Sequence, residues 1–312
     1  MQIITDLQFF PEQFCGGVLS IGKFDGMHLG HSLIINRLKN HANNQQIPTI
    51  ILTFDPLPIT VLRPDGNIQP ICTLERKIEL FHQFNLDALV VLRTDHELLN
   101  QSAETFFFET LRERLKVTVI VEGHNFCFGH DRLGTSEVIR QYGQQTGITI
   151  DIVEPVRRDN QLISSSGIRK LIREGLVEQA AQWMPQPYRL TGTVIQGDQR
   201  GRTLGFPTAN LGKTETIIPK SGIYATIATF DGQSFESTTH IGTNPTFQQS
   251  VPKIEVFVHH FDGDLYDKKM DIDFFAMLRE VIRFESVEEL IQQMNHDIQQ
   301  SHEILIAKRK SF

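Results

Sequence analysis

The sequence has 312 residues, of which 40% are hydrophobic and 21% charged, which favours two folded domains over one domain or a disordered chain. The formal net charge of −7 argues against a nucleic-acid partner, because such proteins usually present a basic surface. Three separate cysteines without a CxxC pair favour reduced thiols over a disulfide framework or a zinc site. No apolar run reaches the roughly 20 residues that span a bilayer, and the first residues lack a basic signal-peptide start. We therefore expect a cytoplasmic protein without a membrane partner, and the sequence leaves its oligomeric state open.

In the first half of the chain, short apolar runs alternate with longer amphipathic stretches. The apolar runs predict strands at 16–22, 47–54, 87–93, 116–123 and 148–155, and the amphipathic stretches predict helices at 29–44, 73–84 and 102–115. This alternation is typical of an α/β domain with a parallel sheet and helices on both faces. In such sheets ligands bind beyond the carboxyl ends of the strands.

The pattern changes near Pro185 and Pro187, which we interpret as a linker between domains 1–184 and 185–312. Beyond it, short segments predict an antiparallel barrel or sandwich of about six strands. These segments are 189–197, 222–230, 234–242, 253–261 and 270–284. Residues 286–310 predict a terminal helix.

Two Asp-Gly pairs and one Ser-Glu pair indicate how these elements begin and turn. Asp231-Gly232 and Asp262-Gly263 have the composition of hairpin turns. Ser286 and Glu289 have the spacing of a capping box for the terminal helix.

The stretch IGKFDGMHLGH, residues 21–31, follows a predicted strand and opens a predicted helix. Gly22 and Gly26 let the backbone turn sharply, and the start of a helix favours an anion. His28 and His31, three residues apart, would lie close together and donate to phosphoryl oxygens as charge builds up during a transfer reaction. The stretch is neither a Walker A loop nor a GxGxxG fingerprint. Two surface histidines in a glycine turn are the simpler alternative.

This stretch resembles the HxGH signature of the nucleotidylyltransferase superfamily. With its FDG prefix it is similar to the adenylyltransferase half of bacterial bifunctional riboflavin kinase/FAD synthetases. Three further segments resemble motifs of that family: TFDPLP at 53–58, VEGHNFCFGHDRLGT at 121–135 and ISSSGIRKLI at 163–172. Leu57 and Asn125 depart from the family, which usually has histidine and aspartate there.

The resemblance implies a role for each matching residue. ATP and its phosphates would be bound by Gly22, Phe24, Asp25, Gly26, His28, His31, Ser164, Ser166 and Arg169. The flavin and nucleotide loop would contain Asn125, Phe126, Phe128 and Gly129. His28 and His31 would also stabilise the transition state of AMP transfer. As alternatives, the serines at 164–166 cap the following helix and Arg169 is a surface charge.

A second stretch rich in glycine and polar residues is GTVIQGDQRGRTLGFPTANL, residues 192–211. Its glycines predict a pliable loop whose amides cradle phosphates, although any single glycine fits a β-turn as well. If PTAN is extended, Thr208 and Asn210 point the same way and offer uncharged oxygens suited to Mg²⁺.

This string resembles the riboflavin kinase signature GxxxGRxxGFPTAN, and GIYA (222–225), IGTNPTF (241–247) and HFDGDLY (260–266) stand in the family's order. The resemblance implies that ATP and its phosphates bind at Gly197, Gly201, Arg202, Gly205, Pro207, Thr208 and Asn210, with Thr208 and Asn210 on the metal. Glu255 would be the catalytic base. It shares a strand face with Phe257, where the family often has a histidine. A surface glutamate on the barrel exterior is the alternative.

The resemblance covers nearly the whole chain and implies a Rossmann-like domain followed by a six-stranded barrel. It implies two ATP-dependent, Mg²⁺-requiring steps, from riboflavin to FMN and from FMN to FAD, so the partners are the small molecules riboflavin, FMN and ATP. Three alternatives remain: a kinase whose first half has decayed, a non-catalytic flavin-binding protein, and a cytidylyltransferase. The last would not explain the kinase string.

Overall fold

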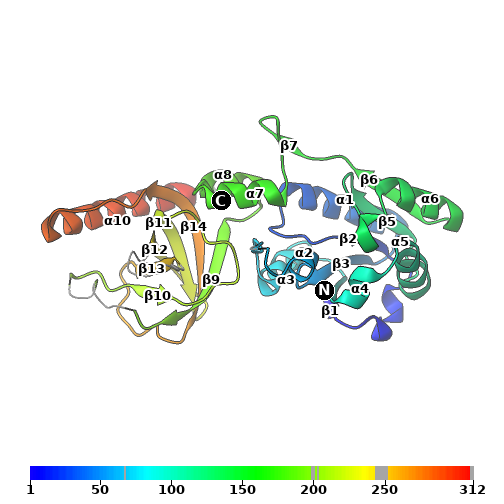
Figure 1. The fold of residues 1–312 in the computed structure, drawn as a ribbon, viewed down its shortest axis with the longest axis horizontal. Coiled ribbons are helices and arrows are strands. Elements are labelled where there is room, and N and C mark those ends of the chain that lie inside the picture. Colours follow the sequence, from blue (N-terminus) through cyan, green and yellow to red (C-terminus); the bar gives the residue numbers. More distant parts are fainter. Residues whose placement is uncertain (67, 198–200, 202–203, 243–251, 310–312) are drawn as a thin grey trace. The chain divides into compact units, whose positions relative to one another are not determined.

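The computed structural model describes residues 1–66, 68–197, 201, 204–242 and 252–309, traced in Figure 1. By their contacts these residues form two compact units, divided between Ser164 and Ser165. Within the described ranges no helix is long and apolar enough to cross a membrane.

The first unit contains a six-stranded parallel sheet. Its strands are β1 (Gln2–Ile4), β2 (Val18–Ile21), β3 (Thr49–Asp55), β4 (Ala88–Arg93), β5 (Val119–Gly123) and β6 (Thr149–Val153). They are hydrogen-bonded in the order β1-β4-β3-β2-β5-β6, with every pair parallel. The predicted parallel sheet is confirmed, with β1 as an additional edge strand.

Helices cover both faces of this sheet. They are α1 (Leu29–Gln45), α2 (Pro58–Leu62), α3 (Leu74–His82), α4 (His96–Asn100), α5 (Ala103–Thr105) and α6 (Ser136–Thr146), and α5 continues into a π-helical segment, Phe106–Arg114. A hairpin of β7 (Arg157–Arg158) and β8 (Gln161–Leu162) follows the sheet.

Two hydrophobic cores lie on opposite sides of the sheet because alternate strand residues point to opposite faces. On β3, Ile51 packs in the core that includes Leu38 of α1 and Phe81 of α3. Its neighbour Ile50 packs in the other core, with Phe107 of the π-helical segment. Most of both sheet faces is therefore covered. The stretch 21–31 begins where β2 ends, at the carboxyl edge of the sheet.

The second unit contains a closed barrel. Its elements are α7 (Ser165–Arg173), α8 (Val177–Trp183), β9 (Tyr188–Ile195), β10 (Ala209–Leu211), β11 (Gly222–Phe230), β12 (Gln233–Gly242), β13 (Lys253–Val258), β14 (Lys269–Arg279) and α10 (Val287–Arg309). The strands close in the order β10-β13-β12-β11-β14-β9, with neighbouring strands antiparallel. The predicted six-stranded barrel with its terminal helix is confirmed. Helix α8 contacts β14 and β9, so it belongs with the barrel by its contacts.

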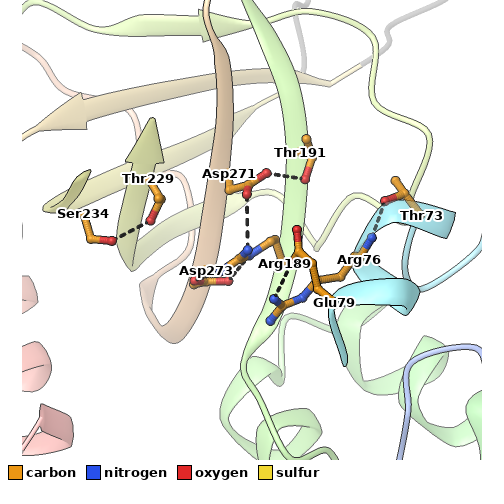
Figure 2. Close-up of polar contacts among 9 residues, drawn as sticks. All are labelled: Thr73, Arg76, Glu79, Arg189, Thr191, Thr229, Ser234, Asp271 and Asp273. Carbon is orange, nitrogen blue, oxygen red and sulfur yellow. Dashed lines mark hydrogen bonds and ion pairs between the residues drawn. The ribbon is translucent and has the colours of Figure 1, made fainter. Parts of the chain in front are cut away.

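Hydrogen bonds and ion pairs between polar side chains connect β9 to β14, as Figure 2 shows. The guanidinium of Arg189 donates to Asp273 at 2.7 Å and to Asp271 at 3.2 Å. Thr191 donates its hydroxyl to Asp271 at 2.7 Å. Because Arg189 lies opposite Asp273, and Thr191 opposite Asp271, these contacts reinforce the register at which the barrel closes.

The two Asp-Gly pairs have different outcomes. Asp231 and Gly232 both have positive φ, 49° and 74°, and join the paired residues Phe230 and Gln233, so this hairpin is confirmed. The hairpin predicted at Asp262-Gly263 is wrong, because β13 and β14 are not neighbours in the barrel. Barrel closure gives β13 the partners β12 and β10 instead.

The start of α10 is capped in a modified way. Ser286 Oγ accepts from the Glu289 amide at 3.2 Å, as predicted for a capping box. The returning contact differs, because the Glu289 carboxylate accepts from the amide of Glu285 at 3.1 Å.

Candidate active sites

The two histidines of the first constellation lie against each other at the start of α1. His28 is the N-cap residue, and its Nδ1 accepts the backbone N–H of His31 at 3.3 Å. The imidazole rings stack with their centroids 3.6 Å apart and an angle of 16° between their planes. The predicted proximity is therefore present, and His28 additionally caps the helix.

Both imidazoles are held neutral. His28 is 8% exposed, and burial lowers its pKa to about 4. Burial, followed by the charges of His28 and Lys77, lowers the pKa of His31 well below its ordinary value. Because Nδ1 of neutral His28 accepts a hydrogen bond, its proton is on Nε2, which is a donor. The buried His31 Nδ1 has no hydrogen-bond partner within the described residues.

The loop before α1 is fixed by Asp25. Its carboxylate is buried and accepts from the amides of Ile71 at 2.9 Å and Cys72 at 3.3 Å. The Cys72 sulfur in turn accepts from the amide of Gly26, which has a φ of 81°. Through these contacts Asp25 connects the turn at Gly26 to residues 71–72.

An aromatic side chain supports the histidines from the same loop. Phe24 is buried and adopts a φ of 46°, which is uncommon for a residue other than glycine. Its ring lies 5.2 Å from the ring of His31 and 5.3 Å from that of Phe81 in α3. The imidazole of His31 is thereby backed by the core of the unit.

A buried lysine beside this site was not predicted. Lys77 of α3 is 3% exposed, and its Nζ donates to Thr53 Oγ1 at 3.4 Å, near the carboxyl end of β3. The sequence did contain a signal, because Lys77 is spaced three residues from Leu74 and four from Phe81, on the apolar face of the helix.

A buried carboxyl group at the end of β5 was also missed. Glu122 is 2% exposed, and its Oε1 accepts the backbone N–H of Ile21, the residue before Gly22. Burial raises the pKa of Glu122 well above its ordinary value. Its signal in the sequence was a single acid at the end of an apolar strand.

The predicted flavin and nucleotide loop follows β5. The rings of Phe126 and Phe128 stack at 5.3 Å, and Phe128 exchanges two backbone hydrogen bonds with Gly134. Gly129 has a φ of 71°, and a Cβ there would lie 2.5 Å from the Ala103 nitrogen, so a side chain does not fit. Asn125, at the start of this loop, is exposed.

Four further residues considered for this site are Leu57, Ser164, Ser166 and Arg169. Leu57 is buried at the start of α2. Ser164 ends the first unit, whereas Ser166 and Arg169 lie on α7, in the second unit. Their assignment to ATP stays a prediction.

In the barrel, three polar side chains form a row across neighbouring strands. Asn210 of β10 lies opposite Glu255 of β13, which lies opposite His240 of β12. His240 Nδ1 and Glu255 Oε2 are 2.9 Å apart, and both side chains are partly exposed. Sequence reasoning selected Asn210 and Glu255 but missed His240, whose partner is known only once β12 and β13 are paired.

Two described glycines of the glycine-rich stretch, Gly197 and Gly201, lie close to predicted metal-binding side chains. A Cβ at Gly197 would lie 2.2 Å from the side-chain nitrogen of Asn210. A Cβ at Gly201 would lie 2.3 Å from the Phe206 carbonyl oxygen and 3.6 Å from Thr208 Oγ1. The two glycines therefore allow the loop to approach the predicted metal-binding side chains closely.

Other predicted kinase residues are placed as follows. Gly205 has a φ of 87°, and Pro207 is exposed. Phe257 packs edge-on against Phe206 at 5.7 Å, which joins the strand of Glu255 to the loop. Arg202 and residues 243–247 of the IGTNPTF segment lie outside the described residues.

In a comparison with known proteins, the chain matches two family models. Residues 10–167 match the model of FAD synthetase, and residues 184–305 match that of riboflavin kinase. A bifunctional riboflavin kinase/FMN adenylyltransferase from Listeria monocytogenes is 34% identical, with 90% of each chain covered.

The chain belongs to the bifunctional riboflavin kinase/FMN adenylyltransferase family. A member from Bacillus subtilis is 33% identical, with 93% of each chain covered. A crystal structure described as a macrolide-efflux protein from Streptococcus pneumoniae has a TM-score of 0.87 and 26% identity, covering 96% of this chain and 98% of its own. The membership extends over both units and agrees with the prediction of two phosphate-binding sites in one chain.

Proposed function

We propose that this protein converts riboflavin and ATP into FMN and ADP in its barrel, and FMN and ATP into FAD and pyrophosphate at its parallel sheet. The observation that carries the proposal is that each half keeps its reactive constellation, the His28–His31 stack and the Asn210–Glu255 pair, in a chain matched by both family models. We assign adenylyl transfer to residues 1–184 and phosphorylation to residues 185–312, in a cytoplasmic enzyme without a nucleic-acid partner.

In adenylyl transfer, a phosphate oxygen of FMN attacks the α-phosphorus of ATP, and the bond from that phosphorus to the leaving pyrophosphate breaks. Negative charge develops on the α-phosphoryl oxygens. His28 Nε2–H and the free amides of the first turn of α1 donate to those oxygens. Stacking on His31 and the helix cap hold the His28 ring in place, so little reorganisation is needed as the charge develops.

In phosphorylation, the terminal ribityl hydroxyl of riboflavin attacks the γ-phosphorus of ATP, and ADP leaves. Glu255 accepts the hydroxyl proton, because an ionised carboxylate offers only acceptors. Gly197, Gly201 and Gly205 allow a close backbone approach, so that backbone amides can donate to the phosphates beside Asn210.

The barrel residues suit Mg²⁺ as the metal of this site. Thr208 and Asn210 offer uncharged oxygens beside the glycine loop, and Mg²⁺ usually takes few protein ligands together with phosphates and water. Among the residues that the structure describes, no cluster of three or more His, Cys, Asp or Glu side chains suited to a metal occurs. When bound, the ion would neutralise charge on the β- and γ-phosphates.

The test is to separate the products formed from riboflavin, ATP and Mg²⁺ by chromatography. We expect FMN to appear first and FAD to follow. FMN alone would support the alternative of a kinase with a decayed first half, to which Leu57 and Asn125 point. If neither FMN nor FAD were formed, the alternative of a non-catalytic flavin-binding protein would be supported. A parallel reaction supplied with FMN measures adenylyl transfer independently of the kinase.

A further inference from the structure

We propose that His240 is a positioning residue for the kinase base, setting the orientation in which the Glu255 carboxylate meets the substrate hydroxyl. The inference rests on the proposed kinase function and adds to it a residue that the sequence motifs did not select.

The pair is built into the register of the barrel. His240 and Glu255 are directly opposite each other on β12 and β13, with Nδ1 and Oε2 2.9 Å apart. Their side chains are 35% and 29% exposed, so the contact lies at the accessible surface of the barrel, where a substrate can reach it. On the other side of β13, Asn210 lies opposite Glu255 and beside the glycine loop. His240 therefore contacts the carboxylate from the strand opposite to the phosphate side.

The direction of this hydrogen bond follows from the chemistry of a base. An ionised carboxylate can only accept, so in the state competent to take a proton His240 Nδ1–H is the donor. The donation limits the rotation of the carboxylate and so sets the orientation in which it meets the ribityl hydroxyl. A base must be within hydrogen-bond reach of the proton that it removes, so fixing its orientation affects the reaction directly.

The backbone of β12 leaves room for this imidazole. A Cβ at Gly242 would lie 2.6 Å from Nε2 and 2.7 Å from Cε1 of His240. The ring therefore lies across Gly242, on the same strand face, and a side chain there would displace it. Two independent features, the strand register and Gly242, thus place the same ring against the same carboxylate.

The step that His240 assists is balanced as follows. The ribityl oxygen forms a bond to the γ-phosphorus while the bond from that phosphorus to the β–γ bridging oxygen breaks, and its electron pair remains on ADP. The hydroxyl proton passes to the Glu255 carboxylate. His240 keeps its own proton throughout, which is why it is a positioning residue and not a second base.

A second histidine–glutamate contact in the chain serves as a control for the loss of a purely structural pair. His302 of α10 and Glu236 of β12 form a second histidine–glutamate contact, with Nδ1 and Oε2 2.6 Å apart. This pair joins the terminal helix to the barrel and includes none of the residues assigned to catalysis. Removing it reports what the loss of such a contact costs the fold alone.

The experiment compares four variants in the full-length protein with riboflavin, ATP and Mg²⁺. His240→Leu removes the donor and should lower kcat for FMN formation about 10- to 100-fold, with the KM for riboflavin changed by no more than a few fold, because small misplacements of reacting groups reach about 10² in rate. His240→Asn keeps a donor at the δ position and should restore most of the rate. His240→Gln, whose amide lies one bond further out, should not, and His302→Leu should leave kcat near wild type.

A spectroscopic measurement accompanies the kinetics. In protein with ¹⁵N-labelled histidine, the Nδ1–H of His240 should give a hydrogen-bonded signal that shifts in Glu255→Gln. A His240→Leu variant with wild-type kcat would overturn the inference. Equal losses of kcat in the Leu, Asn and Gln variants, accompanied by unfolding, would also overturn it. A wild-type protein that makes no FMN would overturn the proposed function and this inference together. The two failures are distinguished because the wild-type assay comes first.

Discussion

Replacing His28 by asparagine separates two roles that its imidazole combines. His28 caps α1 through Nδ1 and presents Nε2–H for the phosphates. Asparagine is a preferred N-cap residue, so His28→Asn keeps an acceptor for the His31 amide, whereas His28→Ala loses it at a cost of about 0.5–2 kcal/mol. Both variants lack the imidazole donor, and losing one preorganised donor typically costs about 10²–10³ in rate. We expect both to lose FAD formation to that extent while FMN formation continues.

A second readout comes from the pKa of His28. It falls from 6.5 to about 4 in the folded protein, and this difference corresponds to about 3 kcal/mol. As the pH falls from 6.5 towards 4, the unfolded chain binds a proton that folded His28 does not, so stability present above pH 6.5 is lost in that range. His28→Asn lacks this group and should lose less stability over the same range.

The assays are product chromatography with FMN and ATP, and chemical denaturation at several pH values. If His28→Asn made FAD at close to the wild-type rate, the imidazole would be only a cap, and the assignment of the stacked pair to phosphoryl chemistry would be wrong. Loss of FMN formation to the same degree in a folded variant would equally contradict a site confined to one reaction.

Three further outcomes are expected. Glu255→Gln should lower FMN formation by about 10²–10⁴, as for the loss of a general base, and leave FAD formation from added FMN within a few fold; near wild-type phosphorylation would refute this. Thr208→Ala and Asn210→Ala should raise the Mg²⁺ concentration needed for the kinase step alone, which a metal titration with each substrate checks. Because Glu122 has a raised pKa, stability falls as the pH rises above the ordinary pKa of glutamate, so Glu122→Gln should raise the melting temperature at pH 8 but not at pH 4. An equal shift at both pH values would contradict that account.

Much of the fold was predictable because its signals are periodic and local. The helix predicted at 29–44 is α1, and the strand predicted at 87–93 is β4, since buried strands and amphipathic helices each have a distinct spacing of apolar residues. The order of the strands was not predictable, because it depends on pairing between distant segments. Asp262-Gly263 illustrates the limit: a local turn signal does not say which strand β13 will pair with.

The sites show the same division. The proximity of His28 and His31 follows from their spacing on a helix, so it could be expected in advance. Lys77, Glu122 and His240 were missed because their hydrogen-bond partners lie on elements that are distant in the sequence. The local pattern around a polar residue does not show which partner the fold brings to it. Lys77 needed the position of β3, Glu122 that of β2, and His240 that of β13.

The two edges of the parallel sheet have different protection against intermolecular strand pairing. β6 carries Asp151, which binds Arg37 and His41 at 2.6 and 2.7 Å, so this edge holds charged groups that discourage a foreign strand. At the other edge, β1 covers β4 with only three residues, and β4 is almost entirely apolar and buried. Detaching those few residues would leave β4 as an open apolar edge. The tendency of this protein to aggregate should therefore depend on its first strand far more than the small size of that strand suggests.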